Sequence, residues 1–417
     1  MDTATLVYVD LEGEPVLTGR LWSRMRKGRN SASFEYDDQW LRRPDRFALE
    51  PALQLAPGPF HTTADQRLFG AMGDSAPDRW GRLLMRRAER RRAEQAGAAP
   101  RTVGEIDYLL MVHDEARQGA LRFAAQPGGP FLASDEAAPI PPLVALPRLL
   151  SAAERVASDQ DSDDDLRLLL APGSSLGGAR PKASVRDQDG QLLVAKFPHR
   201  DDETDTVRWE AVALALAEKA GIRVPPARLE VVGGKPVLLL RRFDRRAGGR
   251  VPFLSALSML GARDNETRSY LEFVDALRRH GAAPRSDMHQ LWRRIVFNVL
   301  ISNTDDHLRN HGFLYEGPAG WRLAPAYDLN PVPVDIRPRV LSTAIDLDDT
   351  TASLDRALDV AAYFELEPPA AAAIAREVGH AVATWRQEAA CRALAAAQID
   401  RLASAFEHED LRAALAI

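Results

Sequence analysis

The sequence predicts an α+β fold with two lobes: a small β-rich N-terminal part and a mostly α-helical C-terminal lobe. At 417 residues the chain is too long for one typical hydrophobic core, so two lobes or domains are expected. Most strand-like apolar runs lie before residue 246, whereas residues 352–417 are alanine-rich and helical in pattern. The composition, 45% hydrophobic and 27% charged, is that of an ordinary globular protein.

Charge and cysteine content exclude several classes of protein. A net charge of −5 argues against a surface that binds nucleic acid as a whole. The single cysteine, Cys391, cannot form an internal disulfide, and no Cys/His cluster predicts a zinc site. The N-terminus lacks a basic leader, and no apolar stretch is long enough to span a membrane. We therefore expect a cytoplasmic protein that does not bind a membrane.

The N-terminal part predicts a small antiparallel sheet followed by a helix. Three strand-like runs are separated by glycine and charged turns: 6–9, 15–17 and 33–36. Further along, Ser75 with Pro77 predicts a helix start, and the arginine-rich run 86–92 extends that helix. We interpret the arginines as a solvated helix face rather than as a contact for DNA or an acidic partner.

The middle of the chain is predicted to contain a boundary between domains. Residues 124–142 are rich in proline, glycine and alanine, as linkers are, and a helical pattern follows at 146–156. The acidic run 158–165 lacks the central glycine and the terminal glutamate of a calcium loop. We therefore expect a solvated loop there.

A glycine- and serine-rich segment precedes a strand-like run at 183–186. It is not a Walker A loop, because Ala179-Arg180 stands where Lys-Ser/Thr is required. Small residues nevertheless let backbone N–H groups approach phosphates closely, as in the glycine-rich loop of kinases, although an ordinary flexible loop has the same composition. The candidate phosphate-binding residues are Ser174, Ser175, Gly177, Gly178 and Lys182.

The next strand-like run, 192–198, contains a lysine among apolar residues. A buried lysine is costly without a partner, so Lys196 needs an anion nearby. The helical pattern at 206–220 offers Glu210, and a strand lysine paired to a helix glutamate is the ion-pair logic of kinases. The alternative is a lysine on an edge strand whose ammonium group reaches solvent.

A predicted hairpin, 229–232 with 236–240, turns at Gly233-Gly234 and runs into Arg242 and Phe243. In a two-lobed kinase this junction is the hinge that binds adenine. Phe243 would then stack on adenine or pack in the core.

The densest polar cluster follows an amphipathic helical pattern at 288–302. Asp305 and Asn310 lie five residues apart near the helix end, and Asp328 follows a short strand-like run at 321–323. A base that accepts a hydroxyl proton, with an Asn and a second Asp that hold magnesium, suits phosphoryl transfer. A helix cap and a turn explain Asp305 and Asn310 taken alone, but not the whole set.

Taken together, these motifs resemble those of the HipA family, the kinase toxins of type II toxin–antitoxin modules. The resemblance covers nearly the whole chain and includes Asp74–Arg82, which is similar to the family's N-terminal signature. It implies a phosphoinositide-kinase-like fold. The motifs that carry it are the glycine/serine loop, Lys196, Glu210, Arg242-Phe243-Asp244-Arg245, Asp305-Asp306-His307-Leu308-Arg309-Asn310 and Tyr327-Asp328.

The resemblance also implies a role for each motif residue. Asp305 would be the catalytic base, and Asn310 and Asp328 would bind Mg²⁺. Lys196 would contact the ATP phosphates, and the segment around Arg242 and Phe243 would be the adenine hinge. His307 falls on the motif histidine, and we expect it to orient Asp305 or Asp328 rather than to transfer a proton itself.

Regulation is implied as well. Ser175 falls where such kinases carry an autophosphorylated serine, and a phosphate there would place negative charge in the ATP phosphate site and inactivate the enzyme. Two features depart from the pattern. Asp306 would add a negative charge beside Asp305 and could raise its pKa, and Arg180-Pro181 replaces a more polar pair.

The expected protein is a toxin-type serine/threonine kinase that stalls growth, as persistence toxins do, by phosphorylating a translation protein, by analogy an aminoacyl-tRNA synthetase. Expected partners are a helix-turn-helix, HipB-like antitoxin and, through it only, operator DNA. The alternatives are a small-molecule kinase resembling aminoglycoside phosphotransferases, or a non-catalytic corepressor that holds the antitoxin on DNA. Four segments are predicted: the N-terminal subdomain 1–122, a linker and helix 123–165, the small lobe 166–246 and the helical lobe 247–417.

Overall fold

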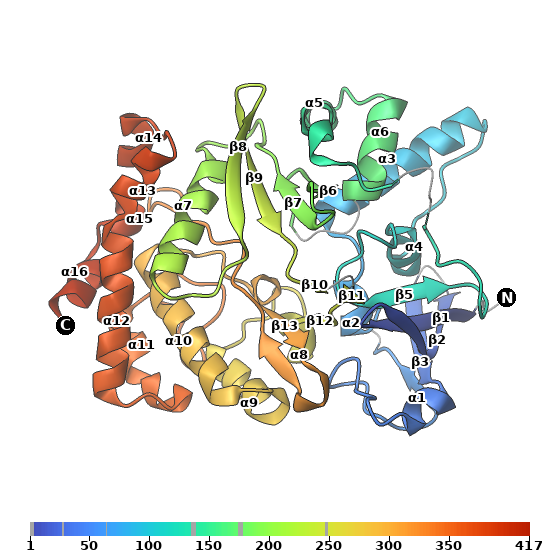
Figure 1. The fold of residues 1–417 in the computed structure, drawn as a ribbon, viewed down its shortest axis with the longest axis horizontal. Coiled ribbons are helices and arrows are strands. Elements are labelled where there is room, and N and C mark those ends of the chain that lie inside the picture. Colours follow the sequence, from blue (N-terminus) through green and yellow to red (C-terminus); the bar gives the residue numbers. More distant parts are fainter. Residues whose placement is uncertain (1–3, 27–28, 64, 135–138, 174–177, 247–248) are drawn as a thin grey trace. The chain divides into compact units, whose positions relative to one another are not determined.

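The chain forms two compact units in a computed structural model that describes residues 4–26, 29–63, 65–134, 139–173, 178–246 and 249–417 (Figure 1). Unit 1 comprises Met1–Asp201 and Glu230–Leu254, and unit 2 comprises Asp202–Leu229 and Ser255–Ile417. Of the predicted site residues, Ser174, Ser175 and Gly177 lie outside the described residues.

The predicted N-terminal sheet is confirmed in unit 1. Five strands lie in the order β4-β3-β2-β1-β5, and every neighbouring pair is antiparallel. Alternating apolar residues face the core, where Val7, Val9, Leu21 and Phe34 are fully buried. The strands are β1 (Ala4–Leu11), β2 (Glu14–Arg26), β3 (Arg29–Tyr36), β4 (Pro59–His61) and β5 (Leu121–Ala124).

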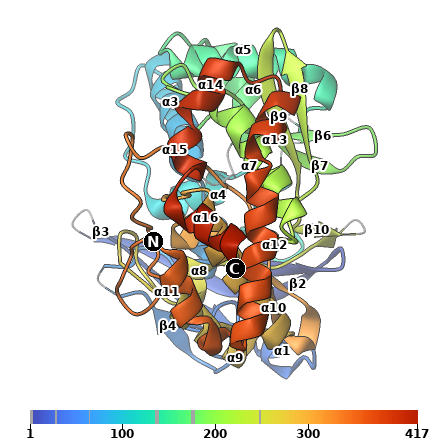
Figure 2. The same ribbon diagram turned by 90° about the vertical axis from the view of Figure 1, so that its left-hand side faces the viewer.

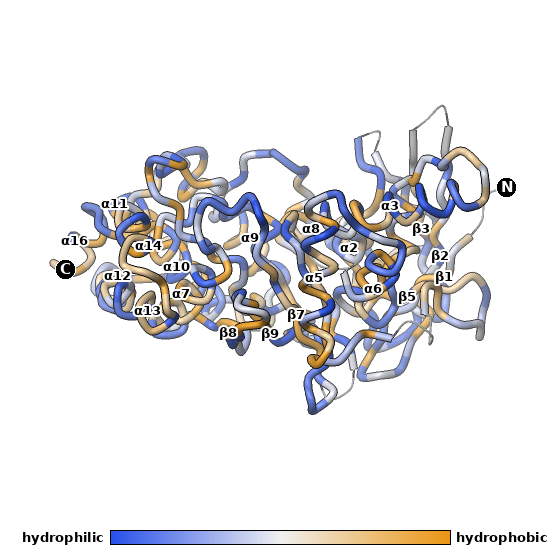
Figure 3. Tube along the Cα trace, turned by 90° about the horizontal axis from the view of Figure 1, so that it is seen from above, coloured by the Kyte–Doolittle hydropathy of each residue, from blue (hydrophilic) through white to orange (hydrophobic). Residues whose placement is uncertain are grey.

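Unit 1 also contains a second antiparallel sheet in the order β6-β7-β9-β8, as the strand-like runs predict. The β8–β9 hairpin turns at Gly233 and Gly234, both with positive φ, which fits a tight turn. The hydrophobic colouring of Figure 3 follows β7 and β9, whose residues Ala195, Val237 and Leu239 are buried. The strands are β6 (Lys182–Arg186), β7 (Leu192–Lys196), β8 (Ala227–Val232, whose first three residues belong to unit 2) and β9 (Lys235–Arg241).

Helices accompany both sheets of unit 1. The pattern at 146–156 predicts α5 correctly, with Leu149, Ala152 and Val156 buried. The helices are α1 (Asp38–Arg42), α2 (Gly70–Asp74), α3 (Arg79–Gln95), α4 (Glu105–Met111), η1 (Leu143–Ala145), α5 (Leu146–Ala157) and α6 (Asp163–Gly173). The short strands β10 (Arg245–Arg246) and β11 (Gly249–Arg250) pair with each other.

The predicted start of α3 is wrong by three residues. Asp78, not Ser75, is the N-cap residue, because the Asp78 carboxylate accepts a hydrogen bond of 3.1 Å from the Gly81 amide. The Ser75 hydroxyl is buried and instead donates to the Ala71 carbonyl.

The prediction of a solvated acidic loop at 158–165 is confirmed for residues 158–162, which lie outside the helices, but is wrong for residues 163–165. Asp163 begins α6, and α6 lies beside α3 (Figure 1). Arg87 on α3 pairs with Asp159 and Asp161, and Arg91 lies 2.8 Å from Asp163. The basic and acidic runs neutralise each other across more than 70 residues of sequence, a pairing that neither run indicates alone.

Unit 2 is mostly helical, as predicted for the C-terminal part. Its central helix is α10, whose residues Leu291, Trp292, Ile295 and Val296 are fully buried. Figure 2 shows α12 running beside α10, against which it packs. The helices are α7 (Thr206–Lys219), α8 (Ala256–Met259), α9 (Tyr270–His280), α10 (Pro284–Leu300), η2 (Leu308–Asn310), η3 (Gly317–Ala319), α11 (Leu354–Asp359), η4 (Ala361–Phe364), α12 (Pro368–Ala383), α13 (Trp385–Cys391), α14 (Ala396–Arg401), α15 (Ala403–Phe406) and α16 (Glu409–Ala416).

One short hairpin interrupts the helices of unit 2. It joins β13 (Gly312–Tyr315) to β14 (Trp321–Leu323), and Phe313 pairs with Leu323. The strand β12 (Phe253–Ser255) lies where the chain passes from unit 1 to unit 2.

The mixture of antiparallel sheets and helices confirms the α+β class, whereas the two-lobed kinase arrangement stays a prediction. The two units also cut the chain differently from the four predicted segments, because the sheet of residues 4–124 and strand β9 share unit 1, while α7 belongs to unit 2. Those segment boundaries stay predictions. No helix in the described part of the chain is both long and apolar enough to cross a membrane.

Candidate functional site

The candidate site of unit 2 begins where α10 ends. Ser302 adopts a left-handed conformation with φ of 51°, which turns the chain out of the helix. Its hydroxyl donates to the Ala405 carbonyl and accepts from Arg339, so the turn is held from two other segments. The segment that follows carries Asp305, Asp306, His307 and Asn310.

Asp305 presents its carboxylate to solvent, since its side chain is 58% exposed. The ion pair that the structure shows to this carboxylate comes from Arg337, at 3.1 Å. His307 is also exposed, and its main-chain amide donates to the Asp305 carbonyl. The predicted orientation of a carboxylate by His307 stays a prediction.

Asn310, in contrast, is buried and fixed. Its side-chain Nδ2 donates to the Asp305 carbonyl at 2.9 Å, and its main-chain amide donates to the His307 carbonyl at 2.8 Å. Because the amide nitrogen is occupied, the side-chain oxygen of Asn310 is left to accept, or to bind a cation.

The β13–β14 hairpin brings Asp328 toward the same segment. The Ala324 amide donates to the Gly312 carbonyl, and the Tyr327 hydroxyl donates to the Arg309 carbonyl at 2.8 Å. The residue beside Asp328 therefore contacts the residue beside Asn310. Asp328 has a φ of 59°, which is rare for a residue other than glycine and marks a strained conformation of the kind that gathers at functional sites.

Asp306 does not have the position expected from the sequence. Its carboxylate is 2% exposed and accepts hydrogen bonds from Tyr270, from Asn298 at 2.6 Å and from His311 at 2.8 Å. Burial raises the pKa of the Asp306 carboxyl, but the contacts with His311 and Tyr270 lower it by more than burial raises it. The pKa of Asp306 therefore lies below its ordinary value. Asp306 is thus an ionised anchor in the core rather than a surface charge beside Asp305.

A chain of side-chain amides connects this anchor to the Asp328 segment. Asn298 accepts at Oδ1 from Asn303 at 3.1 Å, and Asn303 accepts at Oδ1 from the Asn330 amide at 3.3 Å. Asn330 in turn donates to the Asp328 carboxylate at 3.4 Å. Sequence reasoning missed these asparagines, although Asn298 on a buried helix face was an available signal, because a buried amide requires partners.

The predicted phosphate-binding residues that the structure describes lie in unit 1. Gly178 is exposed with a φ of 98°, and Lys182 and Lys196 are directly opposite each other on β6 and β7. Opposed residues of neighbouring strands share one face, and like charges there destabilise a sheet. Two lysines in this position are stabilised by a nearby anion, such as the Asp78 carboxylate beside Lys182.

Lys182 is itself buried, with 5% of its side chain exposed, and its ammonium group lies 3.5 Å from the Asp78 carboxylate. Lys196 is half-buried on β7 in unit 1, whereas Glu210 is buried on α7 in unit 2. The ion pair between Lys196 and Glu210 stays a prediction.

Arg242 uses its guanidinium inside unit 1. It donates to Asp244 at 2.8 Å, to the Ala116 carbonyl at 2.6 Å and to the Arg117 carbonyl at 3.1 Å. Phe243 is half-buried, and its ring centroid lies 6.3 Å from that of Phe253. A nucleotide at this hinge would therefore meet backbone or Phe243 rather than the Arg242 guanidinium, and adenine binding here stays a prediction.

The residues of unit 2 fit magnesium. Magnesium takes hard oxygen ligands and commonly uses only one or two protein side chains, with phosphates and water in the other positions. The Asn310 side-chain oxygen and the Asp328 carboxylate would supply that number. Within the described ranges no group of three or more His, Cys, Asp or Glu side chains forms a metal centre of another type.

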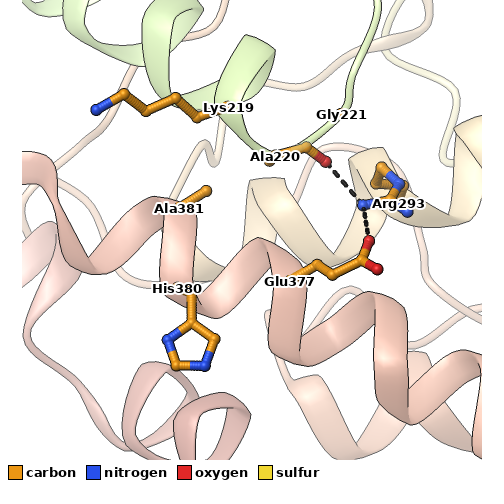
Figure 4. Close-up of a pocket in the computed structure, with 7 residues that line it drawn as sticks. All are labelled: Lys219, Ala220, Gly221, Arg293, Glu377, His380 and Ala381. Carbon is orange, nitrogen blue, oxygen red and sulfur yellow. Dashed lines mark hydrogen bonds and ion pairs between the residues drawn. The ribbon is translucent and has the colours of Figure 1, made fainter.

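A separate pocket of about 500 Å³ lies among α7, α10 and α12 (Figure 4). Arg293 points across it, pairs with Glu377 at 2.8 Å and donates to the Ala220 carbonyl at 2.8 Å. None of the predicted site residues lines this pocket. It therefore contributes nothing to the chemistry described above.

Comparison with known protein families gives two matches. Residues 174–385 match the HipA-like C-terminal domain, and residues 9–107 match the HipA N-terminal domain. The first match alone spans half of the chain and includes all the candidate residues from Ser174 to Asp328.

Individual relatives and solved structures are similar to the chain over most of its length. "Putative kinase Y4mE" of Sinorhizobium fredii is 26% identical over an alignment of 345 positions, and the match covers 75% of each chain. A chain in the solved complex of the Shewanella oneidensis MR-1 toxin–antitoxin system HipA, HipB and its operator DNA has a TM-score of 0.67. That match covers 98% of this chain and 96% of the other at 17% identity, so it shows a shared fold.

Proposed function

Because this chain belongs to the HipA family, we propose that it is a toxin-type protein kinase that transfers the γ-phosphoryl group of ATP to a serine or threonine hydroxyl. The observation that carries the proposal is the arrangement in unit 2: an exposed Asp305, an Asn310 fixed to the Asp305 backbone, and a strained Asp328 held to the same segment. The kinase name of the relative Y4mE is in accord with it.

Asp305 would act as the general base. As the hydroxyl oxygen of the substrate attacks the γ-phosphorus, Asp305 accepts the hydroxyl proton and the bond between phosphorus and the ADP oxygen breaks. Asn310 and Asp328 would bind Mg²⁺, which neutralises charge on the phosphates when bound. Since the Asn310 and Asp328 segments are tied by hydrogen bonds, these two side chains would hold the metal without a large rearrangement of the chain.

The ATP phosphates would be bound in unit 1. Lys182 and Lys196 supply two cations on one face of a sheet, next to Gly178. The resemblance adds Ser174, Ser175 and Gly177 to the phosphate contacts, Glu210 as the partner of Lys196, and the segment of Arg242 and Phe243 as the adenine hinge. Each of these assignments belongs to the proposal.

Partners and regulation follow from the family. A HipB-like antitoxin is the proposed partner, supported by the fold that the chain shares with a member of the HipA, HipB and operator DNA complex. The proposed substrate is a translation protein of the aminoacyl-tRNA synthetase class, and phosphorylation of Ser175 would switch the kinase off. We propose that these reactions take place in the cytoplasm.

The proposal is tested by labelling. Purified protein is incubated with [γ-³²P]ATP, Mg²⁺ and a dialysed bacterial lysate, and Asp305→Asn is compared with Asp335→Asn. Asp335 is a matched control, because its carboxylate is 56% exposed and pairs with Arg401, as that of Asp305 pairs with Arg337. We expect a labelled lysate protein with wild type and Asp335→Asn but not with Asp305→Asn. In a parallel reaction with undialysed lysate, label that enters only small molecules would identify a small-molecule kinase instead.

A further inference from the structure

The first turn of α3 touches both ends of the segment 174–181. At the start of the segment, a Cβ atom on Gly173 would lie 2.8 Å from the Leu84 side chain and 3.2 Å from Trp80 Nε1. At its end, Trp80 Nε1 donates to the Lys182 carbonyl at 2.9 Å. Trp80 of the N-terminal part therefore lies against Gly173 and Lys182, the residues on either side of the glycine-rich segment.

Asp78 adds a charge contact to this arrangement. Its carboxylate caps α3 through Gly81 and also lies 3.5 Å from the Lys182 ammonium group, 104 residues away in sequence. Both side chains are largely shielded from water, with 15% of Asp78 and 5% of Lys182 exposed. An ion pair with so little contact with water is screened far less than one on the surface.

The ammonium group of Lys182 also lies against Gly178. A Cβ atom at Gly178 would meet Lys182 Nζ at 2.7 Å, so this lysine runs directly beside the backbone of the glycine-rich segment. Lysine has a flexible four-carbon stem, and an ammonium group on such a stem needs a fixed counter-charge to hold one position.

We propose that Asp78 is a positioning residue for nucleotide binding, because it holds the Lys182 ammonium group beside Gly178. Trp80 contributes by holding together Gly173 and Lys182, the two residues that flank the segment. The N-terminal part of the chain is then a structural component of the phosphate-binding site, and not only a surface for a partner protein. This inference rests on the proposed function, because it assigns Lys182 to the site that binds ATP.

The test separates the two roles of the Asp78 carboxylate. Asp78→Asn keeps an oxygen that can cap α3 but removes the negative charge that faces Lys182. Asp37→Asn is the matched control, because Asp37 caps α1 through Gln39 and lies 3.8 Å from Arg20, within unit 1 but with no contact to Gly173, Gly178 or Lys182 among the described residues. Both variants are assayed as full-length protein for binding of Mg²⁺ with a non-hydrolysable ATP analogue, and for KM and kcat.

We expect Asp78→Asn to weaken binding of the analogue and to raise KM for ATP by roughly tenfold, the size of one lost charge-assisted hydrogen bond. The kcat value at saturating ATP and the melting temperature should stay close to those of Asp37→Asn. Trp80→Phe keeps an aromatic ring in the core but loses the N–H donor and part of the ring volume, and it should weaken binding in the same direction.

A double-mutant cycle with Lys182→Met distinguishes positioning from general damage. If Asp78 acts through Lys182, then Asp78→Asn changes nothing further in the Lys182→Met background. Equal analogue binding by wild type and Asp78→Asn, or additive losses in the cycle, would overturn the inference and leave the proposed kinase intact. Failure of wild type to bind the ATP analogue would overturn both.

Discussion

At the scale of single residues, the site is defined by the contrast between two neighbours. Asp305 is exposed and pairs only with the half-exposed Arg337 in the contacts described above, whereas Asp306 is buried under three hydrogen-bond donors. Adjacent residues in an irregular segment point in opposite directions, so one carboxylate is available for chemistry and the next one holds the segment in place. The sequence Asp-Asp alone does not show which aspartate is exposed for chemistry and which one is buried.

Substitution of each aspartate should therefore have a different effect. Asp305→Asn should lower kcat by about 10² to 10⁴, the range for loss of a general base, and leave the melting temperature unchanged. Asp306→Asn should lower the free energy of unfolding by about 2–4 kcal/mol, because a buried ion with three donors is replaced by a neutral amide. Urea unfolding and steady-state kinetics on the same preparations measure both. A stable but inactive Asp306→Asn protein would contradict the assigned roles.

At the scale of elements, local pattern predicted most of the secondary structure. The alternating runs of β1 to β3, the Gly233-Gly234 hairpin and the apolar face of α10 all follow from spacing. What local pattern missed depends on distant partners. The acidic run 158–165 is ordered by arginines of α3, and Asp78 rather than Ser75 caps α3 because Lys182 and Gly81 both favour a carboxylate there.

Helix α2 receives a hydrogen-bond acceptor, the Glu50 carboxyl, whose protonation makes the stability of the protein depend on pH. The buried Glu50 carboxylate accepts a hydrogen bond from the Ala71 amide, and burial raises the pKa of Glu50 to about 7. The folded state then holds a proton that the unfolded state has lost above its pKa near 4.5. Stability from this group is full below that unfolded pKa and is lost as pH rises toward 7.

Glu50→Gln should remove this dependence, because a neutral amide keeps an acceptor for Ala71 without the cost of ionisation. At pH 8 we expect the variant to be more stable than wild type by roughly 3 kcal/mol, and at pH 4 the two should be alike. Urea unfolding at a series of pH values between 4 and 8 measures the difference. If the difference in the free energy of unfolding between wild type and variant does not vary with pH, Glu50 is not a buried carboxyl that titrates in this range.

At the scale of the whole molecule, the sequence contained the motif residues but not their supporting structure. Lys196, Asp305, Asn310 and Asp328 were identifiable by residue type and order along the chain. The buried network of Asp306, Asn298 and Asn303 was not, because two of its partners, Tyr270 and Asn330, lie 36 and 27 residues away in sequence and become neighbours only in the fold. The same holds for Asp78, which lies in a different predicted segment from Lys182.

Nucleotide binding should stabilise the molecule if Lys196 contacts phosphate. A non-hydrolysable ATP analogue with Mg²⁺ at 100 times its Kd should add about 2.7 kcal/mol to the stability of the wild type. Lys196→Met should abolish that increment, and Lys235→Met, on β9 of the same sheet, should keep it. Thermal unfolding with and without the analogue gives both values. An unchanged increment in Lys196→Met would exclude this lysine from the phosphate site.

The central claim is that Asp305 supports phosphoryl transfer from ATP. The most direct test is intact-mass spectrometry of phosphate-free protein incubated with Mg²⁺ and ATP, for wild type, Asp305→Ala and Ser175→Ala. The proposal predicts that wild type gains one phosphate group and that neither variant does. If Asp305→Ala gains phosphate as fast as wild type, or if wild type binds ATP and transfers phosphate neither to itself nor to any protein of the lysate, the claim is contradicted.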